Sequence, residues 1–124
     1  MVLLLIVIQI LEICNRSIVI MNNILHINGI RIELDHAIRK CVEFDNQIVV
    51  LIYDDAIIAN NVLCFDKSGT EMWKINDILN IKRPTGNVDI IKEGDNILVV
   101  HSVLGMCFKV DIQRKELIEK AFLR

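Results

Sequence analysis

The chain has 124 residues, of which 53% are hydrophobic and 24% are charged, and its formal net charge is -2. This length predicts one domain with a core of its own, and this composition excludes a disordered tail. The slight negative charge and an aromatic content of 5% argue against a nucleic-acid partner, because such partners require a basic surface and aromatic stacking platforms.

The first twenty residues form an apolar extension that differs from the rest of the chain. No Lys or Arg precedes Arg16, so a secretory signal peptide is not predicted. A membrane helix has this length, but Glu12 near its middle costs about 2.5–3.5 kcal/mol and offsets the aliphatic residues. The alternatives are a start-site extension upstream of Met21, or a helix that lies on the domain or a membrane. We therefore divide the chain into an extension, residues 1–20, and a single β domain, residues 21–124.

The sequence ILHINGIRIEL predicts a β-hairpin, because Asn28-Gly29 is the dipeptide that a type I′ turn favours. After it, AIRKCVEF predicts a strand and Asp45-Asn46 a turn. The continuously apolar QIVVLIY predicts a central strand, since a solvent-facing strand would alternate. A loop, DDAIIANN, occupies residues 54–61. The hairpin of residues 21–34 is expected to cover an open edge of the sheet that follows.

The next stretch, VLCFDKSGTEMWKI, predicts two strands around a turn in which Asp66 bonds to the backbone and Gly69 adopts positive φ. Trp73 is expected to be buried against an opposing sheet. After the connection at residues 76–87, which holds the only proline and allows one short helical turn, the strand order starts again.

The two halves of the β domain repeat one another. Asp45-Asn46 matches Asp95-Asn96, and Leu63–Phe65 matches Met106–Phe108. A repeat of about 40–50 residues is typical of propeller blades. The fold prediction is a mainly β protein with two repeated four-stranded antiparallel meanders plus an N-terminal hairpin, packed as a small sandwich or partial propeller.

VLCFDKSGTEMWKI resembles the last two strands of a pyrroloquinoline-quinone-type propeller repeat over about fourteen residues. Two such blades cannot close a ring, so no cofactor channel and no cofactor are expected. From Asn28 to Phe122 the chain also resembles small bacterial proteins of unknown function, through its NG hairpin and its VEFDN, KSG and KEGDN motifs. That resemblance implies a bacterial partner-binding protein, and an immunity protein is one specific form.

The cysteines and histidines lack the spacing of a zinc site, and no metal site is predicted; they are Cys14, Cys41, Cys64, Cys107, His26, His36 and His101. The cysteines are expected to be reduced, as in a cytoplasmic protein. Cys64 and Cys107 each precede Phe in matching strands, so they could lie close together.

The candidate partner-binding residues belong to the loop at residues 54–61, where the two repeats differ in length. They are Asp54, Asp55, Asn60 and Asn61. The aspartate pair lacks a third group for acid–base chemistry, so no catalytic residue is predicted.

These features predict a non-catalytic protein-binding module of the bacterial cytoplasm, which could act as an immunity protein against a toxin. One alternative is a small-ligand-binding or enzymatic domain with a pocket between the two repeated sheets, lined by His101, Cys107 and Asp55. Another is a membrane-tethered envelope domain, which depends on residues 1–20. Exposed sheet edges make a dimer reasonable.

Overall fold

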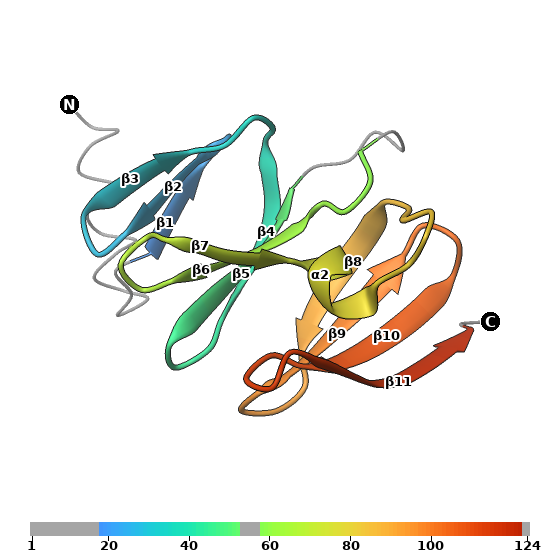
Figure 1. The fold of residues 1–124 in the computed structure, drawn as a ribbon. Coiled ribbons are helices and arrows are strands. Elements are labelled where there is room, and N and C mark those ends of the chain that lie inside the picture. Colours follow the sequence, from blue (N-terminus) through green and yellow to red (C-terminus); the bar gives the residue numbers. More distant parts are fainter. Residues whose placement is uncertain (1–17, 53–57, 123–124) are drawn as a thin grey trace.

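The computed structural model describes residues 18–52 and 58–122, which form three antiparallel sheets and one short helix (Figure 1). The first sheet has the strand order β1-β2-β3, comprising Ile18–Met21, Ile24–Ile27 and Ile30–Glu33. The second has the order β4-β5-β6-β7, comprising Ile38–Glu43, Gln47–Ile52, Val62–Asp66 and Glu71–Lys74. Helix α2, Ile75–Leu79, leads to the third sheet. Its strands β8 to β11 comprise Asn87–Lys92, Ile97–Ser102, Met106–Asp111 and Glu116–Phe122. The mainly β fold and both four-stranded meanders are confirmed.

The N-terminal hairpin is present and has a third strand. Asn28 and Gly29 have φ values of 49° and 83°, which a type I′ turn requires at both central positions. Strand β1 pairs with β2, and Ile18 lies opposite Ile27. Residues 18–20, which the prediction assigned to the extension, therefore belong to the first sheet. The preceding residues 1–17, which hold most of the predicted extension, lie outside the described part.

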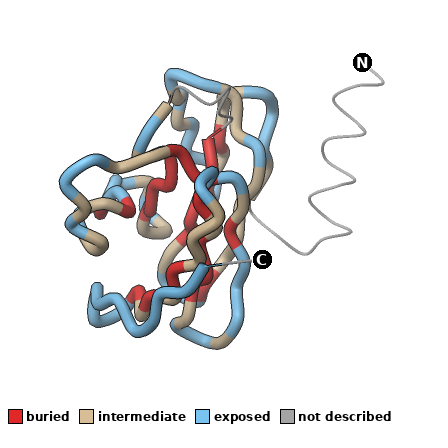
Figure 2. The backbone as a smooth tube through the Cα atoms, turned by 90° about the vertical axis from the view of Figure 1, so that its right-hand side faces the viewer, coloured by how far each residue is buried: buried red, intermediate tan, exposed pale blue. Residues whose placement is uncertain are grey.

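The first sheet covers a face of the second sheet, whereas we expected it to cover an edge. Leu25 and Ile27 are fully buried against one face of β5 and β6. Strand β5 is buried on both faces after Gln47, which explains its continuous apolar sequence and confirms its central position. A sheet with two apolar faces needs a cover on each. Figure 2 shows these buried stretches running through the interior, with exposed turns outside them.

The other face of the second sheet packs against the third sheet. Trp73 lies in this core with 3% of its surface exposed, which confirms its predicted burial. The predicted strand TEMWKI ends early, because β7 stops at Lys74 and α2 begins at Ile75. Asp77 stabilises this start, since its carboxylate accepts a hydrogen bond of 3.0 Å from the Lys74 backbone N–H. The buried Ile75 side chain therefore belongs to α2 and not to a strand.

The register of the repeat differs from the sequence match. Leu51 and His101 are each the fifth residue of their strands, β5 and β9. Leu51 pairs with Val62, and His101 pairs with Cys107. Cys107 is therefore the counterpart of Val62 and not of Cys64, and the match of the two Cys-Phe dipeptides is wrong by two residues. Strand pairing and turn geometry set the register of each meander, so the same dipeptide in both meanders does not have to occupy the same position.

Candidate functional site

The predicted partner-binding residues fall into two groups. Asp54 and Asp55 lie outside the described residues. Asn60 has a φ of 56°, and its side-chain oxygen accepts a hydrogen bond of 2.8 Å from the Asn76 backbone. Asn61 is 1% exposed. Both asparagines therefore hold the fold together at the end of the second sheet.

Asn61 connects the second and third sheets through its whole amide group. Its nitrogen donates hydrogen bonds of 3.0 Å to the carbonyls of Ile52 and Asn87. Its oxygen accepts hydrogen bonds from the backbone and side-chain nitrogens of Asn87, at 2.8 and 3.1 Å. These four bonds leave Asn61 no polar group for a partner, so we leave it out of the candidate surface.

Exposed apolar side chains are concentrated on the third sheet and its turns, which carry seven of the eleven large ones in the described part of the chain. Four of the seven lie at one end of that sheet, and we call them the apolar end. They are Val88, Val103, Leu104 and Phe122, with 39%, 44%, 69% and 73% of their surface exposed. Strand pairing brings them together: Asn87 lies opposite Ser102, and Met106 lies opposite Phe122. Apolar groups gathered at one place on a surface are typical of interaction sites.

The turn between β9 and β10 holds Val103 and Leu104 rigidly. Gly105 has a φ of 86°, and its N–H donates a bond of 3.1 Å to the Ser102 carbonyl. The buried Ser102 hydroxyl accepts bonds from the backbone nitrogens of Leu104 and Met106, at 3.3 and 3.1 Å. The Val103 N–H donates a bond of 2.9 Å to the Gly86 carbonyl. Two apolar side chains are thus presented on a fixed backbone, where a turn would ordinarily carry polar residues.

Sequence reasoning passed over this turn. The prediction of a partner-binding loop favours residues 54–61 because VLG, residues 103–105, is the shorter of the two corresponding loops. The available signal was the chemistry of the loop, because two apolar residues at the tip of a tight turn have no core to enter. The described end of the longer loop, residues 58–61, lies at the same end of the molecule as this turn, since Asn61 bonds to Asn87 and Val103 bonds to Gly86.

Asp89, His101 and Cys107 lie opposite one another across β8, β9 and β10. Partial burial works to raise the pKa of Asp89, but the Lys40 ammonium at 2.9 Å outweighs it and holds that pKa below its usual range. The row lies on the sheet face that points away from the core, since the alternate residues Ile90, Val100 and Phe108 are the buried ones. In residues 18–52 and 58–122, no group of three acidic, histidine or cysteine side chains could hold a metal ion.

Side chains fill the described core between the second and third sheets. A groove of about 240 Å³ opens at the turns, where residues 44–47 of the second sheet face Asn96, Ile112 and Gln113 of the third. A cavity of about 10 Å³ lies beside α2, and it could hold about one water molecule. Cys64 is buried in this core as a free thiol, and burial raises its pKa to about 12. Cys107 is also a free thiol, on the opposite face of the third sheet. The fold thus brings neither His101 nor Cys107 into a pocket between the sheets.

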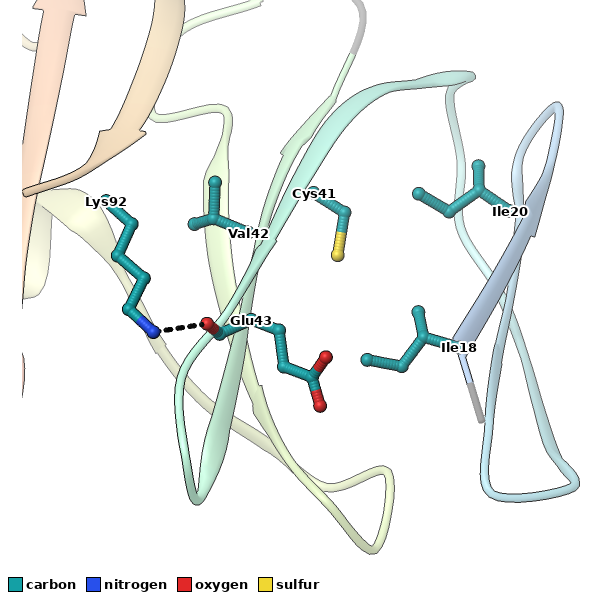
Figure 3. A pocket seen from close by; sticks show the side chains of 6 residues that line it. All are labelled: Ile18, Ile20, Cys41, Val42, Glu43 and Lys92. Carbon is teal, nitrogen blue, oxygen red and sulfur yellow. Dashed lines mark hydrogen bonds between the residues drawn. The ribbon is translucent and has the colours of Figure 1, made fainter. Parts of the chain in front are cut away.

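A groove of about 530 Å³ runs between β1 and β4 (Figure 3). Ile18 and Ile20 face Cys41 and the Glu43 carboxylate across it. Lys92 lies on the other side of β4, where its ammonium donates a bond of 3.1 Å to the Glu43 backbone carbonyl. The groove has an apolar wall, but its charged groups are engaged within the chain, since the Glu43 carboxylate pairs with Lys67.

No helix within the described ranges is both long and apolar enough to cross a membrane. A search of curated proteins finds no match to the chain. A family model does match, and it covers residues 16–122, which includes all eleven described strands. The chain therefore belongs to the family described as a domain of unknown function, DUF7957.

Proposed function

We propose that this protein is a non-catalytic protein-binding domain that docks a partner through the apolar end of its third sheet. The observation that carries the proposal is the pair Val103 and Leu104, exposed on a turn that four hydrogen bonds hold in place. Exposed apolar side chains supply binding free energy when a partner removes them from water.

The rigidity of the turn favours recognition. Association costs less conformational entropy when the contacting groups are already ordered. Ser102 and Gly105 order the turn before any partner arrives. Phe122 adds a large apolar side chain beside it, and aromatic residues are frequent binding hot spots.

The most specific form of the proposal is an immunity protein that neutralises a toxin in the bacterial cytoplasm. In the same proposal, the two meanders are propeller-blade-like repeats. Two features support the repeat: the two meanders share one strand order, and the β-bulge at Met72 has its counterpart at Ile118. Co-expression with the toxic product of a neighbouring gene should restore growth if this form is correct.

Affinity purification with variants at the turn tests the proposal. The protein is tagged in the cells that produce it naturally, and co-purifying proteins are quantified by mass spectrometry. We expect the double variant Val103→Ser, Leu104→Ser to weaken binding of a partner by about thirtyfold or more, because two hot-spot truncations cost about 2 kcal/mol or more.

Ile30→Ser is the matched control, since Ile30 is 41% exposed and lies on the first sheet. Circular dichroism confirms that each variant is folded. If the turn variant and Ile30→Ser capture equal amounts of the partner, the apolar end is not the binding surface.

A further inference from the structure

We infer that the partner presents an apolar pocket bordered by carboxylates, because a basic pair, Lys82 and Arg83, stands beside the apolar end. This inference rests on the proposed function and names the chemistry of the partner. Both side chains are exposed. No salt bridge joins either of them to an acidic group in the described part of the chain.

The segment that carries the basic pair is fixed at both ends. At its start, the Asn76 side chain donates to the Ile81 carbonyl at 3.1 Å and accepts from the Ile81 N–H at 2.9 Å. At its end, the Thr85 carbonyl accepts a bond of 3.3 Å from the Asn60 N–H. Pro84 between these points removes one backbone torsion. The fold therefore defines the course of the backbone from which the two cationic side chains extend.

The basic pair lies close to the turn. The Gly86 carbonyl accepts the hydrogen bond from Val103, and Arg83 is only three residues before Gly86. The backbone of Arg83 thus lies within roughly 14 Å of the turn. Two cations beside an apolar centre reproduce the ordinary anatomy of a protein interface, with an apolar core and a charged rim.

A protein partner accounts for these features better than a lipid surface does. The net charge of -2 disfavours approach to an extended anionic membrane, and Asp77 adds an exposed acidic group on α2. A protein pocket can place its carboxylates opposite Lys82 and Arg83 alone. Such pairs accelerate association and lose strength as salt rises.

The test uses two synthetic probes and nuclear magnetic resonance of the full chain. One probe is a 14-residue amphipathic peptide of Leu, Phe and Glu, and the other carries Lys at every Glu. We expect the acidic peptide to shift the amide signals of Lys82, Arg83, Gly86, Val103 and Leu104, and to bind more weakly at higher salt. Charge reversal, Lys82→Glu with Arg83→Glu, should weaken acidic-peptide binding by about tenfold and make the basic peptide the better ligand.

Arg114→Glu with Lys115→Glu is the matched control, an adjacent basic pair in the β10–β11 turn, and it should bind as the wild type does. This inference is overturned if reversal of Lys82 and Arg83 leaves the peptide preference unchanged. The proposed function still stands in that case if the Val103→Ser, Leu104→Ser variant loses binding.

Preference of the wild type for the basic peptide also overturns the inference, and would favour a role for Asp54 and Asp55. If neither peptide shifts the signals of the turn, the proposed function fails as well. Binding to vesicles of phosphatidylserine and phosphatidylcholine that depends on Leu104, without binding to either peptide, makes a membrane the occupant and overturns both.

Discussion

Asn61 shows how one buried amide can hold two sheets together. It satisfies the Ile52 carbonyl on the second sheet and the backbone of Asn87 on the third. We expect Asn61→Ala to lower the free energy of unfolding by about 2–4 kcal/mol, because it leaves several buried polar groups without partners. Urea denaturation measures the change. The exposed Asn46→Ala is the control and should change the stability by less than about 0.5 kcal/mol. A loss at Asn61 no larger than the loss at Asn46 would contradict this account.

The two thiols of the repeat should differ in reactivity. Burial raises the pKa of Cys64 to about 12, so the nucleophilic thiolate is scarce at neutral pH and the sulfur is covered. Cys107 is partly exposed. We expect iodoacetamide to label Cys107 in the folded protein, and Cys64 only after urea unfolds it. Peptide mapping by mass spectrometry separates the two sites. Equal labelling of both in the native protein would show that the core opens on the time scale of the reaction.

At the scale of the element, two glycines in turns differ both in backbone torsion and in the space around them. Gly69 has a φ of 90°, and a Cβ added there would lie 3.1 Å from the Ile30 side chain. Gly94 lies outside the positive-φ region, and its Cβ would make only ordinary contacts, at 3.6 Å or more. We expect Gly69→Ala to destabilise the protein by about 1–2 kcal/mol, and Gly94→Ala to be neutral or stabilising by up to about 1 kcal/mol. Thermal denaturation measures both, and equal effects would contradict the expected cost of positive φ and of the close Ile30 contact at Gly69.

At the scale of the molecule, charged side chains make the outward face of the third sheet polar. Phe44, Cys64 and Trp73 fill the core on the second sheet. By strand pairing, their counterparts on the third sheet are Glu93, Lys109 and Glu119. Lys109 bonds to Glu93 at 3.0 Å, and this pair raises the pKa of Lys109, with a further contribution from Glu119. These charges make the outward face polar, which disfavours the packing of another apolar surface against it.

Apolar residues at these three positions should allow the third sheet to stack against a second molecule. We expect the triple variant Glu93→Phe, Lys109→Val, Glu119→Trp to self-associate with rising concentration, because it exposes an apolar sheet face. Sedimentation velocity compares its mass with that of the wild type and of a conservative control, Glu93→Asp, Lys109→Arg, Glu119→Asp. A triple variant that sediments as the wild type does at every concentration would contradict the capping role of the charges.

The sequence by itself determined the features that depend on local chemistry. Asn28-Gly29 predicted its turn because both positions need positive φ, and the continuous apolar run of β5 predicted a strand buried on both faces. The two meanders and the burial of Trp73 followed from similar patterns.

Only the tertiary structure decided how distant segments meet. It placed the first sheet on a face of the second, shifted the match of the two repeats, and assigned Asn61 to the interior. It also gathered Val88, Val103, Leu104 and Phe122 at one end of the third sheet. The physical reason is that a turn is specified by the torsions and hydrogen bonds of neighbouring residues. A surface is specified by which strand ends come together, and this depends on the burial of every face at once.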